Sequence, residues 1–398
     1  MPLIELLSDK SVWERFYRYK ASLECPKRFT KELRAFIDAE RYLPVCESVR
    51  RGESFPLPRK TVISKQFSEK KRTVYTYPEP ENTVLKLLTY LLSREYDGIF
   101  SDGLYSFRPR RTAKDAIRKL TTAPGMEKMY AYKADVSDYF NSVPIEKLLP
   151  VLEKTLRHDP GTYAFLSRLL REERVLSGGR ELIERKGIMA GTPLSAFYAN
   201  LYLAEMDEFF EHTGVLYARY SDDIVVFDDS PEKVRAHAQS VRAFLDDKGL
   251  AINEKKEFFF APSEGWSFLG FDYRQGVTDI AASSLDKIKH KMRRKTRALE
   301  RWQKRNALSG EKAAKAFIRI FNRKLFESPD DSELSWCRWY FPLINTDESL
   351  KAIDHYAQDC VRYLATGTRT KARFNLRYDD MKRLGYRSLV NAYYGFEG

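Results

Sequence analysis

The alternation of apolar and polar positions predicts several helices. Within residues 83–100 the apolar side chains recur every three to four positions, as on one buried helix face: Val84, Leu87, Leu88 and Leu91. Residues 193–210 are apolar on most sides and predict a buried helix. Residues 231–250 predict an amphipathic helix that ends at Gly249, because glycine commonly follows the last helical turn.

Shorter runs of β-branched and aromatic residues predict strands. These runs cover residues 61–64, 72–77, 128–140, 251–260 and 266–274. Residues 215–227, VLYARYSDDIVVF, contain two such runs around a polar centre and predict a hairpin. The order strand, helix, hairpin, helix and strand predicts an α+β fold in which helices cover one face of an antiparallel sheet.

Length and composition set the broad class of the protein. The chain has 398 residues, enough for two or three subdomains. Its 69 Lys and Arg exceed its 56 Asp and Glu, which favours a polyanionic partner such as nucleic acid, with simple solvation of these charges as the alternative. The 4 cysteines form no CxxC pair, and no apolar run approaches the roughly 20 residues that span a bilayer. We therefore expect a cytoplasmic protein with no membrane partner.

Two adjacent carboxylates, Asp222 and Asp223, lie between the apolar runs of the predicted hairpin. Aspartate is common in turns, so an ordinary solvated turn is the alternative interpretation. The turn itself supplies no cation, so two like charges there are costly unless a cation lies between them. Hard ions such as Mg²⁺ prefer oxygen ligands, and Asp135, in another apolar run, offers a third carboxylate. Two metals about 4 Å apart on such carboxylates suit phosphoryl transfer.

Four segments, in this order, resemble motifs of the bacterial reverse transcriptases, in the branch that contains group II intron, retron and phage-defence enzymes. They are Tyr105-Ser-Phe-Arg-Pro109, Asp135-Val-Ser-Asp-Tyr-Phe140, Tyr220-Ser-Asp-Asp223 and Phe268-Leu-Gly-Phe271. The third segment resembles the YxDD box of the family, and the fourth resembles the strand under the primer end. The resemblance covers roughly residues 65–275, and the chain looks most like the defence-associated members.

The resemblance implies a catalytic site. Asp135, Asp222 and Asp223 are implied to be catalytic and to hold two Mg²⁺ ions, with Mn²⁺ as the alternative metal. The carbonyl of Val136 is implied as a further metal ligand. Phe140 is implied to select deoxynucleotides, because an aromatic ring at this position blocks a ribose 2′-hydroxyl. The alternative for Phe140 is ordinary core packing.

Five further residues are implied to bind the incoming dNTP: Lys71, Arg72, Gly191, Ser195 and Lys256. The first two follow Lys70 in a basic fingers strand, Gly191 permits close backbone approach, and Lys256 resembles a lysine near the leaving pyrophosphate. Solvated lysines and an ordinary helix start at Gly191 are the alternatives.

Two positions depart from the family pattern. The chain has Ala190 and Ala196 where the family usually has Gln and Pro. The missing Gln side chain leaves the handling of the template open.

Arginines on two segments are implied to contact nucleic acid. Arg108 and Arg111 are expected at template phosphates, with internal bonding as the alternative for Arg108. Residues 286–305 contain ten Lys or Arg and two acids, and predict a helix whose basic residues contact duplex phosphates without reading sequence. The arginines expected there are Arg293, Arg294 and Arg297. A solvated charged helix is the alternative.

The resemblance implies a right-hand polymerase with fingers, palm and helical thumb. We expect an N-terminal helical extension in residues 1–60 and fingers in residues 61–125. We expect a palm in residues 126–275, with a fingers insertion near residues 150–185. A helical basic thumb and C-terminal region is expected in residues 276–398.

Together these features predict an RNA-directed DNA polymerase that adds dNMPs to a primer 3′-hydroxyl. The resemblance extends this to a role in bacterial antiphage defence, with a noncoding RNA as template or scaffold. The expected partners are that RNA, the DNA product and dNTPs, and the oligomeric state stays open. The alternatives are untemplated or protein-primed DNA synthesis, RNA synthesis on a similar palm, which Phe140 disfavours, and noncatalytic RNA binding in splicing.

Overall fold

The computed structural model describes residues 2–23, 27–64, 71–327 and 335–396. The chain divides into two compact units, one formed only by residues before Gly265 and one formed almost entirely by Gly265–Gly398. Lys70, expected at the start of a basic strand, lies outside the described residues. Within the described ranges, no helix combines the length and the apolar character needed to cross a bilayer.

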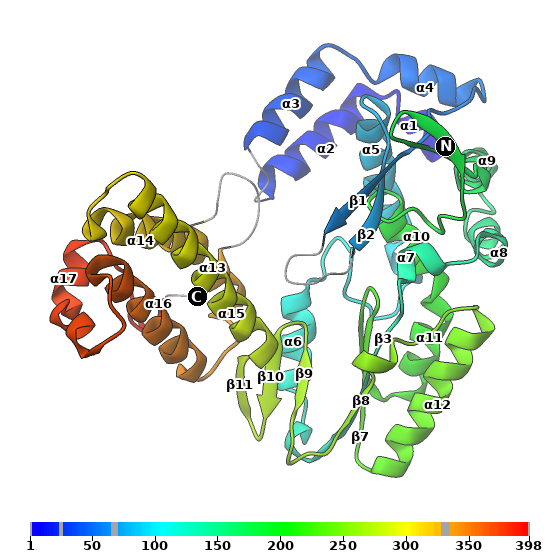
Figure 1. The fold of residues 1–398 in the computed structure, drawn as a ribbon. Helices are drawn as coiled ribbons and strands as arrows, with labels where there is room; N and C mark the ends of the chain where they lie inside the picture. The colour runs from blue at the N-terminus through cyan, green and yellow to red at the C-terminus, as the bar shows by residue number, and fades with distance from the viewer. Residues whose placement is uncertain (1, 24–26, 65–70, 328–334, 397–398) are drawn as a thin grey trace. The chain divides into compact units, whose positions relative to one another are not determined.

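The first unit mixes helices with two sheets (Figure 1). Its helices and strands are α1 (Leu3–Leu6), α2 (Lys10–Ser22), α3 (Lys27–Asp38), α4 (Leu43–Arg50), β1 (Arg59–Ser64), β2 (Lys71–Thr76), α5 (Glu81–Glu95), α6 (Ala113–Thr121), β3 (Tyr130–Asp135), α7 (Tyr139–Ser142), α8 (Ile145–Thr155), α9 (Pro160–Arg171), β4 (Arg174–Ser177), β5 (Arg180–Ile183), α10 (Ser195–Tyr202), α11 (Ala204–Thr213), β6 (Leu216–Tyr220), β7 (Asp223–Asp228), α12 (Pro231–Asp247) and β8 (Phe258–Phe260).

The sheet that contains the predicted hairpin has the strand order β6-β7-β3-β8, and every neighbouring pair is antiparallel. Helix α12 packs against β3 and β7 (Figure 1). Its buried residues recur at helical spacing: Val234, Ala238, Val241 and Leu245. Gly249 adopts a left-handed conformation two residues after the helix, with φ 69°, as the sequence predicts. The predicted α+β fold with helices against an antiparallel sheet is confirmed.

A second sheet has the order β2-β1-β4-β5. β1 and β2 form an antiparallel hairpin, and β1 joins β4 in parallel at Arg59 and Leu176. The amide of Tyr75 in β2 donates to the carbonyl of Ala190 at 2.8 Å. This bond attaches the sheet to the loop that precedes α10.

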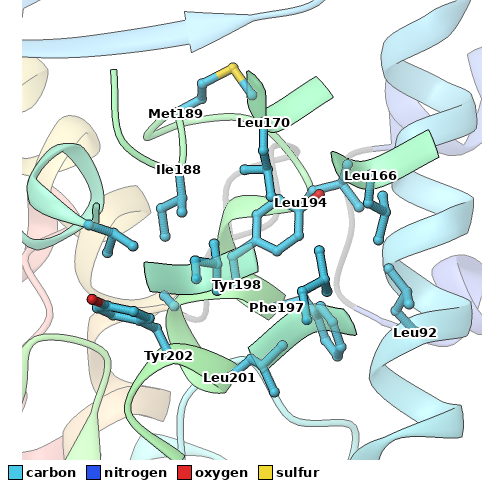
Figure 2. Packing of buried hydrophobic residues seen from close by; sticks show 14 of the residues in the cluster. Leu92, Leu166, Leu170, Ile188, Met189, Leu194, Phe197, Tyr198, Leu201 and Tyr202 are labelled. Carbon is cyan, nitrogen blue, oxygen red and sulfur yellow. The ribbon is translucent and has the colours of Figure 1, made fainter. Parts of the chain in front are cut away.

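A continuous apolar core surrounds α10, in which seven of eight residues are buried. Figure 2 shows Phe197, Tyr198 and Leu201 of this helix among side chains of α5 and α9. Trp13 and Phe16 bring α2 into the same cluster, which also includes residues of both sheets. The core therefore joins the N-terminal helices and the two sheets into one unit.

The second unit begins with a small sheet and continues as helices. Its strands β9 (Trp266–Phe268), β10 (Phe271–Arg274) and β11 (Val277–Ile280) form an antiparallel sheet in the order β11-β10-β9. Among its helices, α13, α14 and α16 contact one another. The helices are α13 (Ala282–Arg305), α14 (Gly310–Phe326), α15 (Trp336–Tyr340), α16 (Glu348–Thr366), α17 (Tyr378–Arg383) and α18 (Leu389–Tyr394).

Four segments differ from the sequence predictions. The strand predicted for residues 128–140 covers only Tyr130–Asp135, and Tyr139–Ser142 form the short helix α7. The helix predicted for residues 193–210 is two helices, because Leu203 leaves the helical conformation at φ −108° and ψ 11°. The strand predicted for residues 266–274 is a hairpin, because Leu269 and Gly270 both have positive φ and turn the chain back. Only the last three residues of the predicted strand 251–260 are extended in a strand.

Candidate active site

The antiparallel register of β3 and β7 brings the three predicted carboxylates together. Asp135 ends β3 and lies directly opposite Asp223, the first residue of β7. The carbonyl of Asp222, in the turn before β7, accepts a 3.0 Å hydrogen bond from the amide of Val136. Residues that are far apart in sequence therefore occupy neighbouring backbone positions at one end of the sheet.

The position of these carboxylates is electrostatically unfavourable. Asp135 is buried, and Asp222 and Asp223 are partly buried. Burial, reinforced by repulsion from Asp135, raises the pKa of Asp222. Burial, together with repulsion from Asp222 and Asp135, raises the pKa of Asp223 to about 6. The folded chain thus concentrates negative charge where a cation would be stabilised.

The cation that this structure places there is the ammonium of Lys256. It forms an ion pair with Asp135, and the other carboxylate oxygen of Asp135 accepts a 3.2 Å hydrogen bond from the side-chain Nδ2 of Asn253. The charges of Asp223 and Asp222 also act on this lysine and help to raise its pKa, although burial opposes the rise. Lys256, expected near a leaving pyrophosphate, therefore lies at the carboxylate cluster.

The donor chemistry of the cluster fits a hard divalent cation, since it consists of carboxylate oxygens beside the backbone of Val136. In the arrangement described, Asp135 is held by Lys256 and Asn253. Among the described residues, no three His, Cys, Asp or Glu side chains already converge closely enough to hold a metal ion. The backbone thus brings the three carboxylate residues near one another, while the Asp135 carboxylate itself is paired with Lys256.

A buried ion pair contacts the backbone of the turn that carries Asp222. Arg219, the fourth residue of β6, forms a two-pronged contact with Asp207 of α11, and both side chains have no exposed surface. The guanidinium also donates to the carbonyl of Ser221 at 3.1 Å, and the hydroxyl of Tyr217 donates to Asp207 at 2.7 Å. The sequence analysis missed this pair, since only the tertiary fold brings α11 against β6.

A second set of hydrogen bonds also holds the turn. The hydroxyl of Ser106 accepts from the amide of Ser221 at 2.9 Å and donates to the amide oxygen of Asn200 at 3.1 Å. Asn200 in turn donates to the carbonyl of Ser106 at 2.8 Å. Ser221 has φ 61°, a left-handed conformation that serine adopts only when its surroundings require it. These hydrogen bonds hold Ser221 in a backbone conformation that is uncommon for residues other than glycine.

Phe140 lies next to two other aromatic rings. Its ring centre is 6.3 Å from that of Phe107 in an edge-to-face arrangement, and Phe107 is 6.4 Å from Tyr220 of the hairpin. Phe140 is only partly buried and packs against the core, so the position is compatible with both of its expected roles. Phe107 is 46% exposed, so part of its side chain stays accessible to solvent beside Phe140.

The loop from Gly187 to Leu194 lies close to both Phe140 and β2. The amide of Ile188 donates to the carbonyl of Phe140 at 2.9 Å. Gly191 has φ 100°, and a Cβ there would meet the carbonyl of Tyr75 at 3.1 Å, so glycine is required by packing against β2. The hydroxyl of Ser195 donates to the carbonyl of Thr192 at 2.7 Å. These contacts give Gly191 and Ser195 local structural roles, beside any contact with a nucleotide.

The remaining predicted basic residues fall into paired and exposed groups. Arg108 is buried in bonds to Asp97 and to the carbonyl of Ser101, which favours the internal role left open for it. Arg111 pairs with Asp102. Lys71 and Arg72 are exposed at the start of β2.

Three further arginines lie in the second unit, on α13. This helix covers the basic segment predicted at residues 286–305 and turns its buried face, which includes Ile288 and Met292, inward. Its exposed residues include Arg293, Arg294 and Arg297. An exposed basic face of this kind is suited to phosphate contact.

The part of the chain that contains this site is similar to known proteins. Residues 64–273, more than half of the chain, match the family "Reverse transcriptase (RNA-dependent DNA polymerase)". The chain is 23% identical over 224 residues to the group II intron-encoded protein LtrA of Lactococcus lactis subsp. cremoris, over 54% of this chain and 35% of that protein. It is 24% identical over 169 residues to an uncharacterized 91 kDa protein in the cob intron of Schizosaccharomyces pombe, over 42% of this chain and 20% of that protein. The matched part thus spans 35% or less of the length of these relatives.

Solved structures of telomerase are also similar. Apo telomerase from Candida tropicalis gives a TM-score of 0.48 at 10% identity, over 83% of this chain and 69% of that chain. Telomerase from Candida albicans in complex with a fragment of telomeric RNA gives a TM-score of 0.45 at 11% identity, over 86% of this chain and 68% of that chain.

The buried pair yields a stability prediction. Asp207→Ala leaves the Arg219 cation buried and unpaired, so we expect the free energy of unfolding to fall by about 3–5 kcal/mol. Urea unfolding followed by circular dichroism measures this. As a control, Glu32→Ala breaks the exposed pair with Arg28 and should cost no more than about 0.5 kcal/mol. Equal losses in the two variants would contradict the supporting role of the pair.

The raised pKa of Asp223 predicts a pH-dependent stability. The native state holds this proton more tightly than the unfolded state does, so wild-type stability falls as pH rises from about 4 through about 6. Without divalent ions, Asp223→Asn should therefore be about 1–3 kcal/mol more stable than wild type at pH 8, and the gain should vanish below about pH 4. Urea unfolding in EDTA at both pH values checks this.

The control for this experiment is Asp229→Asn, since Asp229 is 71% exposed. It should show no comparable gain at pH 8. An Asp223→Asn variant no more stable than wild type at pH 8 would argue against a repulsive carboxylate cluster.

Proposed function

The chain belongs to the reverse transcriptase family, and we propose that it is an RNA-directed DNA polymerase that adds dNMPs to a primer 3′-hydroxyl. The observation that carries this proposal is the register that places Asp135 opposite Asp223, with Asp222 in the adjoining turn. The family match over residues 64–273 includes all three of these residues. In the reaction the primer 3′-oxygen attacks the α-phosphorus of a dNTP, and pyrophosphate leaves.

The proposed metal ligands are Asp135, Asp222 and Asp223, with the carbonyl of Val136. Two Mg²⁺ ions held there, or Mn²⁺ as the alternative, would supply Lewis-acid activation of the primer hydroxyl and neutralise charge on the triphosphate. Lys256 lies at the same cluster through its ion pair with Asp135. Its ammonium is proposed to contact the pyrophosphate once Asp135 is engaged by metal.

The proposed nucleotide site combines side chains from three elements. Phe140, on α7, is proposed to lie under the sugar, which its partial exposure and its place five residues after Asp135 support. The loop at Gly191 and Ser195 is proposed to lie beside the nucleotide. Lys71 and Arg72, exposed on β2, are proposed to contact the triphosphate.

We propose that the chain has the fingers, palm and thumb organisation of a right-hand polymerase. The β2-β1-β4-β5 sheet would belong to the fingers, and the carboxylate sheet to the palm. The helices after Gly265 would form the thumb and C-terminal region, with the arginines of α13 on duplex phosphates. Arg111 is a further proposed phosphate contact, while the internal bonds of Arg108 favour a structural role.

The finer role that we propose is bacterial antiphage defence with a bound noncoding RNA. Its support is the sequence resemblance to the defence-associated branch. Sequencing of the RNA and DNA that copurify with the protein tests this. A discrete cDNA complementary to one RNA supports templated synthesis, whereas a homopolymer favours the untemplated alternative, which Ala190 in place of the usual Gln keeps open.

The carboxylates give a prediction for activity. Asp222→Asn with Asp223→Asn should lower primer extension on an RNA template by at least about 10³-fold, because the proposed metal ligands are lost. Binding of the same primer and template, measured by fluorescence anisotropy, should stay within a few-fold of wild type. The matched control is Asp228→Asn with Asp229→Asn, a second Asp-Asp pair at the other end of β7, which should retain extension. Wild-type extension by the Asp222 and Asp223 variant would reject the catalytic assignment.

Phe140 gives a prediction for sugar selection. Phe140→Ala should reduce the preference for dNTP over rNTP by about 10–100-fold, because one lost steric contact is worth about 1–3 kcal/mol. The ratio of kcat/KM values for dGTP and GTP incorporation measures it. Phe140→Tyr keeps the ring and should retain the preference. If both variants discriminate like wild type, Phe140 serves packing alone.

A further inference from the structure

A cleft of about 340 Å³ lies on the first unit between α2 and α5 and ends at Phe107. We call it the α2–α5 cleft. Six of its lining side chains define it: Tyr19, Lys20, Lys86, Tyr90, Arg94 and Phe107. Helices α2 and α5 are in contact, and both belong to the same compact unit. The site therefore forms within one body of the protein.

The lining of the cleft is cationic. Lysines and arginines contribute four of its described lining residues, and no carboxylate is among them. Arg108 is neutralised by Asp97, and Lys86 lies 3.7 Å from Glu79. Lys20 and Arg94 also contact aromatic rings. An anionic ligand is therefore favoured over a neutral or cationic one.

The lining is also aromatic. The guanidinium of Arg94 lies 4.8 Å from the ring centre of Tyr19 and 4.5 Å from that of Tyr90. The ammonium of Lys20 lies 5.5 Å from the Tyr19 ring. Flat rings and guanidinium planes alternating with positive charge suit a ligand that has both a base and a phosphate.

Phe107 connects the cleft with the candidate active site. Its backbone has φ 56°, and its neighbours Ser106 and Arg108 are both fixed by hydrogen bonds. Phe107, a residue that is 46% exposed, thus has a backbone conformation that is costly for a bulky side chain. One edge of this ring meets Phe140, while the residue also lines the cleft. Phe107 therefore contacts Phe140 and also stays partly exposed where it lines the cleft.

We propose that the α2–α5 cleft binds one unpaired nucleotide of a single-stranded RNA, with Phe107 stacked on the base and Lys20, Lys86 and Arg94 near the phosphates. The volume is at the small end of ligand pockets, about 300–1,000 Å³, and so suits one nucleotide rather than a duplex. The proposal rests on the proposed function for RNA as the substrate class. Tyr19 and Lys20 lie outside the matched family region, residues 64–273, so this chain's own N-terminal helix completes the site.

The test measures how tightly the full chain binds a short, 5′-labelled single-stranded oligoribonucleotide. Binding is monitored by fluorescence anisotropy in the absence of dNTP. Phe107→Ala should weaken binding about 5- to 100-fold, because one stacked base is lost, while Phe107→Tyr should bind like wild type. Lys20→Ala with Arg94→Ala should weaken binding and reduce the magnitude of the slope of log affinity against log salt by about 1.4, at about 0.7 for each lost phosphate contact on a single strand. Unchanged binding by both Phe107→Ala and the double variant would overturn the proposal.

Two controls separate this result from folding and from catalysis. Arg28→Ala with Arg235→Ala removes two arginines that are 85% and 68% exposed, and should leave binding within about two-fold. Losses equal to those of the cleft variants would point to net charge alone and overturn the site. The Asp222→Asn and Asp223→Asn variant should keep full binding. The wild-type protein could fail to extend a primer while Phe107→Ala still weakens RNA binding. That result would reject the polymerase proposal and support RNA binding in the cleft.

Crosslinking identifies the source of the RNA. With a photoreactive residue analogue at Phe107, RNA is annealed to primers of two lengths and irradiated. A crosslink that moves along the RNA with the primer end identifies the strand being copied, and one at a fixed RNA position identifies a structural RNA. Either pattern supports an RNA nucleotide in the cleft, whereas absence of any crosslink overturns it.

Discussion

The buried contact between Arg219 and Asp207 is the interaction on which the geometry of the candidate site depends. Arg219 of this pair also donates a hydrogen bond to the carbonyl of Ser221, the residue before Asp222 and Asp223. A buried ion pair contributes little net stability by itself, but removal of one partner is costly. Its effect here is to hold the carbonyl of Ser221, while the hydroxyl of Ser106 accepts a hydrogen bond from the amide of the same residue. These two hydrogen bonds to Ser221 thus oppose displacement of the turn that carries Asp222 by repulsion among the carboxylates.

That repulsion has a chemical consequence. Burial and mutual repulsion raise the pKa of Asp222 and Asp223, so ionisation of the cluster is favourable only beside positive charge. Lys256 supplies such charge through Asp135 in this structure. Carboxylates grouped in this way are suited to bind cations in place of the Lys256 ammonium. The proposed polymerase function uses the same property, because the reaction develops charge on phosphate oxygens.

Local sequence patterns predicted most of the elements but not their boundaries or their partners. The hairpin at residues 215–227 and the helix at 231–250 follow from apolar periodicity, and both are present. The break at Leu203 and the turn at Leu269 and Gly270 were missed, because each interrupts an apolar run without a strong local signal. The roles of Asp207 and Arg219 were missed for a similar reason, since each looks like an ordinary exposed charge until α11 packs against β6.

The sequence by itself determined which chemical groups the chain has and that Asp222 and Asp223 share one turn, because neighbours in the chain stay neighbours in the fold. It also carried the motif order that led to the reverse transcriptase family. Only the tertiary structure decided that Asp135 lies opposite Asp223, since strand register depends on pairing across the sheet. It alone decided that Arg108 is buried while Phe107 beside it is exposed. Exposure is a property of packing between distant segments, and no local pattern encodes it.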